Sequence, residues 1–222
     1  MIVADAVCVA DGYDIIIGIV SAILLNLFQG NQSHKKQLIE HMREAENSLQ
    51  LVLGELAAYL SKHHMQRNVW DDIIDLENRL NQYISEAYLY QNNTFQSHPR
   101  YYIDYFEMRM KQCNVLHNLH YEMKKIRKMP VQAQIIYNYI LCLMEHVTEQ
   151  NDPAKQMEEL QAVFDTMKTE ALPVSREEFE NRAILYHILM DLEEFLMFKR
   201  RFINNLGKKQ KDRYWENDND IC

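Results

Sequence analysis

Apolar side chains recur every three or four positions along most of this chain, which is the spacing of one face of an α-helix. In the stretch from Ser33 to His64 the pattern is carried by Leu38, Met42, Ala45, Leu49, Val52, Leu53, Leu56 and Leu60. A strand would instead alternate apolar and polar positions, and no segment does so over a convincing length. The pattern therefore predicts a long amphipathic helix over residues 33–64.

Five further helices are predicted, and turn-forming or capping residues mark their ends. They are about Asn68–Tyr90, Pro99–Met129, a fourth helix from Pro130, a fifth from Pro153 and a last helix from Ser175 to Leu206. The start of the last helix is well defined, because Ser175 and Glu178 match the S-x-x-E capping box. After Gly207 the sequence KKQKDRYWENDNDIC is polar and mixed in charge, which is typical of a disordered tail.

The N-terminal stretch YDIIIGIVSAILLNLF, residues 13–28, differs from the rest because it is apolar on every side. Between Ile15 and Phe28 only Ser21 and Asn26 are polar, and no residue is charged. A helix of this length covers roughly 21 Å of a hydrocarbon core of about 30 Å, which is short for a membrane span. A buried core helix or an export signal would also be apolar, but no basic residue precedes the stretch and no cleavage site follows it. We favour a membrane helix, with the candidate residues Ile15, Gly18, Ser21, Leu25, Asn26 and Phe28.

The charges on either side of this stretch indicate an orientation. Every charged residue before position 34 is an aspartate, whereas Lys35, Lys36 and Arg43 follow the stretch. An excess of Lys and Arg marks the cytoplasmic side of a membrane. The sequence thus predicts a single-pass protein of the cell membrane with its C-terminal region in the cytoplasm.

These elements combine into an all-α fold, an antiparallel bundle of about six long helices preceded by one N-terminal transmembrane helix. The 222 residues include only 5 Gly and 4 Pro, so few breaks interrupt the helices. We expect three parts: residues 1–30 with the membrane helix at about 13–28, a cytoplasmic bundle at 31–206 and the tail at 207–222.

Composition and motifs exclude several function classes. A formal net charge of −8 argues against nucleic acid as a partner. No glycine-rich phosphate loop is present, and no His follows a Glu at the three-residue spacing of di-iron bundles. The four cysteines share no metal-binding spacing. We therefore expect neither an enzyme nor a cofactor or metal site.

Two groups of residues are candidates for binding. Aromatic side chains gather around the loop between the second and third helices, at Tyr88, Tyr90, Tyr101, Tyr102 and Tyr105. They could line a pocket for an aromatic ligand, or simply pack one end of the bundle. The basic run Lys199, Arg200 and Arg201 could contact anionic lipid headgroups, or form an ordinary solvated helix face.

The segments DIIIGIVSAILLNLF and DLEEFLMFKRRFINNL, the latter at residues 191–206, carry a resemblance to a known family. The chain from Tyr13 to Leu206 resembles the last membrane helix and cytoplasmic domain of the aromatic acid exporter family of bacteria. The resemblance implies an N-terminal membrane domain of several spans, which this chain lacks. We therefore expect a truncated or fragmentary exporter-like chain.

This resemblance implies a regulatory or assembly role in the efflux of aromatic carboxylates, with no transport by this chain alone. The expected partners are the membrane and either further copies of the chain or other spans of an exporter. No small-molecule ligand follows from the residues themselves. The alternative is a stand-alone soluble interaction module, in which the apolar N-terminal stretch is part of the core.

Overall fold

We describe the chain from a computed structural model. It describes residues 2–62, 67–94 and 98–216, without the side chains at 2–16, 19–20, 22–31, 62, 208, 213 and 216. The elements are α1 Ile2–Lys62, α2 Val69–Asn93, α3 Arg100–Met123, α4 Ala133–Glu145, α5 Ala154–Thr169, α6 Arg176–Asn205, α7 Lys208–Lys211 and a π-helical turn at Asp212–Glu216. No strand occurs in these ranges, and the predicted all-α class is confirmed.

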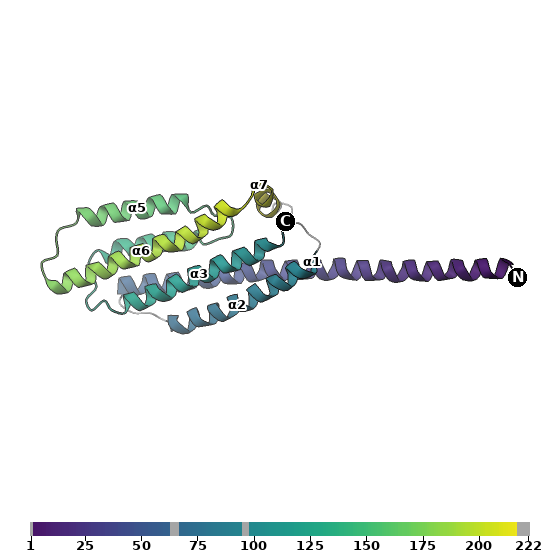
Figure 1. Cartoon of the computed structure of the whole chain (residues 1–222). Coiled ribbons are helices and arrows are strands. Elements are labelled where there is room, and N and C mark those ends of the chain that lie inside the picture. The colour runs from purple at the N-terminus through teal and green to yellow at the C-terminus, as the bar shows by residue number, and fades with distance from the viewer. Residues whose placement is uncertain (1, 63–66, 95–97, 217–222) are drawn as a thin grey trace.

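The bundle is elongated, and its helices run roughly along one direction (Figure 1). Helix α3 packs against α2 on one side and α6 on the other, while α1 packs against α2, α3 and α4. Helix α5 contacts both α4 and α6. The N-terminal part of α1 extends far beyond one end of the bundle, and α7 lies near the end from which it emerges (Figure 1).

The apolar faces predicted from the sequence form the core. All eight apolar positions that predicted the first helix are buried, from Leu38 to Leu60. The apolar side chains of α2, α3, α4 and α6 pack against them in one continuous cluster. Burying one such side chain contributes roughly 1.5–3 kcal/mol, so these faces dominate the stability of the bundle.

Helix α1 is one continuous helix of 61 residues, where the sequence suggested a membrane helix followed by a separate amphipathic one. No proline interrupts it, since the first proline of the chain is Pro99. At about 1.5 Å per residue the helix is roughly 90 Å long. It therefore joins the apolar stretch to the bundle core without a break in the helix.

Much of the predicted membrane helix lies outside the described side chains, including Ile15, Leu25, Asn26 and Phe28. Where side chains are described, they are outside the core: Ile17 is 62% exposed, and Gly18 and Ser21 are also exposed. A side chain at Gly18 would meet no atom within 4 Å. Among the described residues, no helix combines the length and the apolarity needed to cross a bilayer.

The observed helix boundaries agree in part with those predicted from capping residues in the sequence. The Ser175 hydroxyl accepts a hydrogen bond from the Glu178 N–H at 3.1 Å, as the capping box predicts. The Glu178 carboxylate accepts from Val174 at 2.9 Å, one residue before the cap. Helix α3 ends at Met123, earlier than the predicted Met129, and a turn follows at Lys124 and Lys125. Ile126 is buried there.

The tail differs from the predicted disorder as far as Glu216. Residues 208–216 form two short helical turns. The Tyr214 ring stacks on Tyr101 at 4.0 Å between centroids, and its hydroxyl donates to the His98 carbonyl at 2.8 Å. The Trp215 indole N–H donates to the Tyr101 hydroxyl at 3.2 Å. These two aromatic side chains hold the segment on the bundle, while residues 217–222 lie outside the described structure.

Candidate functional site

A buried ion pair joins α1 to α3. Arg109 is 1% exposed and Glu46 4% exposed. The Arg109 guanidinium donates to Glu46 Oε1 at 3.1 Å, and the Tyr105 hydroxyl donates to the same oxygen at 2.7 Å. Arg109 also donates to the Tyr105 hydroxyl and to Gln112 Oε1, each at 2.9 Å. Breaking one partner of such a pair leaves an uncompensated buried charge, so these residues fix how α1 sits on α3.

The polar cluster continues to the α4–α5 connection and α6. The Tyr101 hydroxyl donates to Glu149 Oε1 at 2.5 Å. The Lys199 ammonium donates to the Thr148 carbonyl at 3.1 Å and also to the Glu149 carbonyl. Arg43, on α1, lies 3.5 Å from a Glu46 oxygen and 3.9 Å from a Glu149 oxygen. The cluster therefore connects four parts of the bundle: α1, α3, the α4–α5 connection and α6.

Burial shifts the charge states of this cluster. Burial lowers the pKa of Lys199 to about 7, and the nearby Arg109 charge acts in the same direction. Burial raises the pKa of Glu149, although the Tyr101 hydrogen bond opposes this rise. Burial also raises the pKa of Tyr105 well above its ordinary value. A pKa of about 7 means that the charge of Lys199 changes near neutral pH.

The five candidate tyrosines separate into two environments. Tyr90, Tyr101, Tyr102 and Tyr105 are buried and contact one another or other rings of the core. Tyr88 is exposed, and its hydroxyl donates to Glu107 at 3.4 Å. The four buried rings thus pack the end of the bundle, and two of them carry the hydroxyls of the polar cluster.

The three consecutive cations of α6 point in three directions, as successive residues of a helix do. Lys199 is buried and reaches the carbonyls of the α4–α5 connection, so in this structure its ammonium is not available to a lipid headgroup. Arg200 is exposed and approaches the Met157 sulfur at 3.7 Å. Arg201 is exposed beside α3. Headgroup contact stays a prediction for the two arginines.

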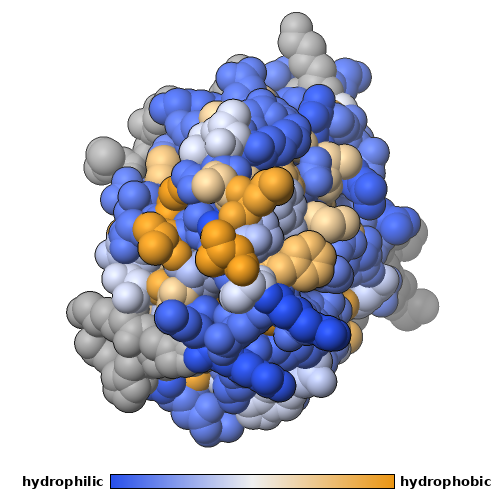
Figure 2. All heavy atoms as spheres, turned by 90° about the vertical axis from the view of Figure 1, so that its left-hand side faces the viewer, coloured by the Kyte–Doolittle hydropathy of each residue, from blue (hydrophilic) through white to orange (hydrophobic). Residues whose placement is uncertain are grey.

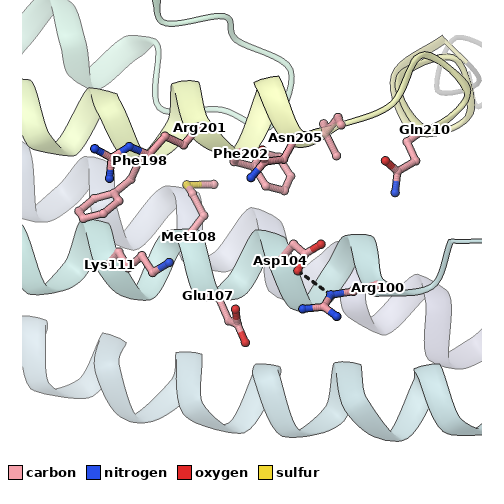
Figure 3. A pocket seen from close by; sticks show the side chains of 11 residues that line it. Arg100, Asp104, Glu107, Met108, Lys111, Phe198, Arg201, Phe202, Asn205 and Gln210 are labelled. Atoms are coloured by element: carbon pink, nitrogen blue, oxygen red, sulfur yellow. Dashed lines mark hydrogen bonds and ion pairs between the residues drawn. The ribbon is translucent and has the colours of Figure 1, made fainter.

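Arg201 lines a hollow of about 420 Å³ between α3 and α6, called the α3/α6 groove below. Its residues are Arg100, Asp104, Glu107, Met108, Lys111, Phe198, Arg201, Phe202, Asn205, Leu206 and Gln210. Figure 3 shows side chains of α3 and α6 facing each other across it, with the Arg100–Asp104 ion pair at 3.2 Å toward one end. The groove combines an apolar wall with charged groups, and its volume is in the range of ligand sites.

Within the described residues, no group of three or more His, Cys, Asp or Glu side chains is arranged to hold a metal ion. His117 and His120, three residues apart on α3, both lie beside the Trp70 ring, at 4.4 and 6.1 Å between centroids. Burial lowers the pKa of His120. This pair is thus part of an aromatic contact between α2 and α3.

The far end of the bundle, opposite the emerging part of α1, exposes apolar side chains. Apolar groups gather on this face (Figure 2). Val131, Leu172, Val174 and Phe179 are each more than half exposed. A hollow of about 490 Å³ lies beside Leu172 and Phe179, between the α5–α6 connection and α6. Exposed apolar patches of this kind often mark contact surfaces.

Comparison with known proteins decides the family. Residues 35–200 match the family described as "Putative aromatic acid exporter C-terminal domain". The chain belongs to this family. The match covers the bundle from the second half of α1 into α6 as far as Arg200, and so includes the buried cluster and the α3 side of the α3/α6 groove.

Two relatives agree with this assignment. The "Uncharacterized protein YqjA" of Bacillus subtilis is 27% identical over 190 residues, which are 85% of this chain and 58% of that protein. The chain therefore spans little more than half the length of this relative. A crystal structure of a "putative membrane protein from Clostridium difficile 630" is similar with a TM-score of 0.67 and 27% identity. The region of similarity covers 76% of this chain and 98% of the solved chain.

Sequence reasoning missed Glu46, Arg109 and Gln112, although a signal was present. Arg109 and Gln112 lie four and seven positions after Tyr105, on the stripe that continues with Leu116. Polar residues at such positions must be paired if they are buried. The partner Glu46 could not be found the same way, because it lies 63 residues from Arg109 in the chain.

Proposed function

We propose that this chain is a membrane-anchored regulatory or assembly domain of an aromatic acid exporter-like protein. The apolar stretch of α1 enters the bilayer, and the bundle lies on the cytoplasmic side. Aromatic carboxylates are the cargo of the assembled exporter, and this chain alone neither transports them nor catalyses a reaction. Its partners are the bilayer and either further copies or other spans of an exporter.

The observation that carries the proposal is the continuity of α1. The helix runs through the apolar stretch and continues into the bundle core, where Glu46 is bound by Arg109 and Tyr105. A helix without a break transmits a tilt or rotation from one end to the other. The family assignment, and the membrane protein named in the Clostridium structure, support the same function. The bilayer position itself follows from the sequence of residues 13–28 and their flanking charges.

A sedimentation experiment tests the anchor. Full-length chain and a chain beginning at residue 31 are expressed in bacteria, and membranes are washed with alkaline carbonate. We expect the full chain to stay in the membrane pellet and the shortened chain to be in the supernatant. Recovery of the full chain in the supernatant would contradict the anchor.

A second candidate function is favoured by the exposed apolar end of the bundle around Leu172, Val174 and Phe179 (Figure 2). Such a patch suits a stand-alone protein-interaction module. That function requires no bilayer, so it predicts that both chains stay in the supernatant. The same experiment therefore separates the two functions.

A further inference from the structure

The C-terminal segment, residues 208–216, docks on the bundle beside the buried polar cluster, near the end from which α1 emerges (Figure 1). We propose that its docking site is an acceptor for a pair of adjacent aromatic side chains, and that the segment is a releasable latch on the polar cluster. The pair that occupies the site is Tyr214 and Trp215 of the chain itself. The consequence of the latch for a membrane anchor rests on the proposed function.

The acceptor site matches the two rings in both shape and polarity. Tyr214 stacks on Tyr101, with 4.0 Å between ring centroids and 6° between the planes, and meets Tyr102 edge-on at 5.7 Å. Its hydroxyl donates to the His98 carbonyl at 2.8 Å, while the Trp215 N–H donates to the Tyr101 hydroxyl at 3.2 Å. Stacked and edge-on ring pairs stabilise beyond the area that they bury. Each ring therefore has a polar partner that an aliphatic side chain could not use.

Two lysines favour tryptophan at the second position of the pair. The ammonium nitrogens of Lys199 and Lys211 each lie 5.9 Å from the centre of the Trp215 ring. Cations within about 6 Å of a ring face are attracted to it, and tryptophan binds them best among the aromatic side chains. Lys199 belongs to α6 and Lys211 to the segment, so this contact also joins the segment to the bundle.

The backbone before α3 is held in an uncommon conformation at this site. His98 has the one positive φ among the described residues other than glycine, at 65°. Its carbonyl accepts from the Tyr101 N–H at 3.3 Å and from the Tyr214 hydroxyl. Such conformations persist where their surroundings hold them, and they cluster at ligand contacts and switch regions. The turn at His98 therefore presents its carbonyl to the ring pair.

The attachment of the segment favours release. Leu206 and Gly207 join it to the end of α6, and its own helical turns are only four and five residues long. Helices of this length are not stable alone, because forming the first turn orders several residues for one hydrogen bond. Tyr214 and Trp215 are only half-buried. The docked state thus balances a few side-chain contacts against the entropy lost when the segment becomes ordered.

Release would act on the polar cluster directly. The Tyr101 hydroxyl accepts from Trp215 and donates to Glu149 at 2.5 Å. Glu149 lies 3.9 Å from Arg43, which belongs to α1. Tyr101 is fully buried, and Tyr214 covers one face of its ring. Without the segment, water would reach Tyr101 and Glu149, and the contact between the α4–α5 connection and α1 would loosen.

A peptide that copies the segment tests the acceptor site. The peptide KKQKDRYWE, residues 208–216, carries a fluorophore, and its binding to the full chain in detergent micelles is followed by anisotropy. The Tyr214→Ala/Trp215→Ala variant should bind one peptide per chain saturably. The native chain should bind it at least tenfold more weakly, because its own segment occupies the site. Circular dichroism checks that the variant stays helical.

Two controls separate the ring pair from charge and from general exposure. The peptide KKQKDRAAE keeps every charge and should bind the variant at least tenfold more weakly than KKQKDRYWE. Trp70→Ala/Tyr121→Ala removes two exposed rings elsewhere on the bundle, and this variant should bind KKQKDRYWE as weakly as the native chain does. Absence of saturable binding to the Tyr214/Trp215 variant would overturn the acceptor site, and so would equal binding of the two peptides.

Hydrogen exchange tests the latch. Amides around Arg43 and Glu46 should exchange at least threefold faster in the Tyr214/Trp215 variant than in the native chain, and saturating KKQKDRYWE should restore the native rate. Residues 69–76 of α2, at the far end of the bundle, should exchange at the same rate in both. Unchanged exchange around Arg43 would overturn the latch. That result leaves the membrane anchor standing, because sedimentation tests the anchor independently of the segment.

Discussion

The buried pair of Glu46 and Arg109 yields a sharp prediction about stability. Replacing Glu46 by Leu removes the acceptor of both the Arg109 guanidinium and the Tyr105 hydroxyl. Arg109 would then keep its charge at 1% exposure. Removing one partner of a buried pair costs roughly 3–5 kcal/mol, so we expect Glu46→Leu to lower the free energy of unfolding by about that amount.

Replacing Arg109 instead of Glu46 should lower the free energy of unfolding by a smaller amount. In Arg109→Met, Glu46 keeps Arg43 at 3.5 Å, and Arg43 is itself half-exposed. Some of the negative charge is therefore still compensated. The double variant removes both buried charges, and replacing a whole buried pair by apolar residues is often close to neutral. We expect a coupling energy of at least about 2 kcal/mol in the double-mutant cycle.

The assay is urea unfolding of the bundle at pH 7, followed by helical circular dichroism. The exposed pair of Arg100 and Asp104 is the control, and its single variants should each change stability by less than about 1 kcal/mol. Additive effects of the two core substitutions would refute the reasoning, as would a cost for Glu46→Leu no larger than that of the exposed pair. Either result would mean that water reaches Arg109.

Three further predictions follow from burial and from the predicted orientation in the membrane. Residues 31–206 should fold alone with a helical spectrum, and Leu192→Asp should destabilise them by several kcal/mol, since Leu192 is fully buried. Lys199 has a folded pKa of about 7, below its unfolded value of about 10.4, so the unfolded chain binds more protons between these values. Stability should therefore rise with pH from 7 to 9.5 by up to about 1.4 kcal/mol per unit, and Lys199→Met should flatten that slope. Cys142, which is half-buried, should react with an impermeant thiol reagent only after cells are permeabilised; labelling in intact cells would reverse the orientation.

The helical faces could be predicted from the sequence because each depends on residues close together in the chain. Leu38 to Leu60 shows a regular spacing, and the Ser175 cap needs only the next three residues. Such local signals fix where helices form and which side faces inward. They also placed the four buried tyrosines near one another.

The polar cluster and the groove depend on pairs that are distant in the chain. Periodicity could mark Arg109 as facing inward, but only the packing of α1 against α3 shows that Glu46 neutralises it. The run from Lys199 to Arg201 looks like one basic patch in the sequence, yet helix geometry separates its members. The sequence predicted a disordered tail because the contacts that hold it are distant in the chain. Tyr214 and Trp215 pack on Tyr101, which lies more than 100 residues earlier.

The central claim is that the apolar stretch of α1 lies in the bilayer, and that α1 has left the bilayer before the residues that form the bundle. Depth-dependent quenching tests this most directly. The four cysteines are replaced, and a fluorophore is attached at Ser21→Cys or, as the control on the same helix, at Ser33→Cys. In lipid vesicles we predict that brominated acyl chains quench the label at position 21 and aqueous iodide quenches the label at position 33. Equal quenching of both labels by iodide, with none by the brominated chains, would contradict the claim.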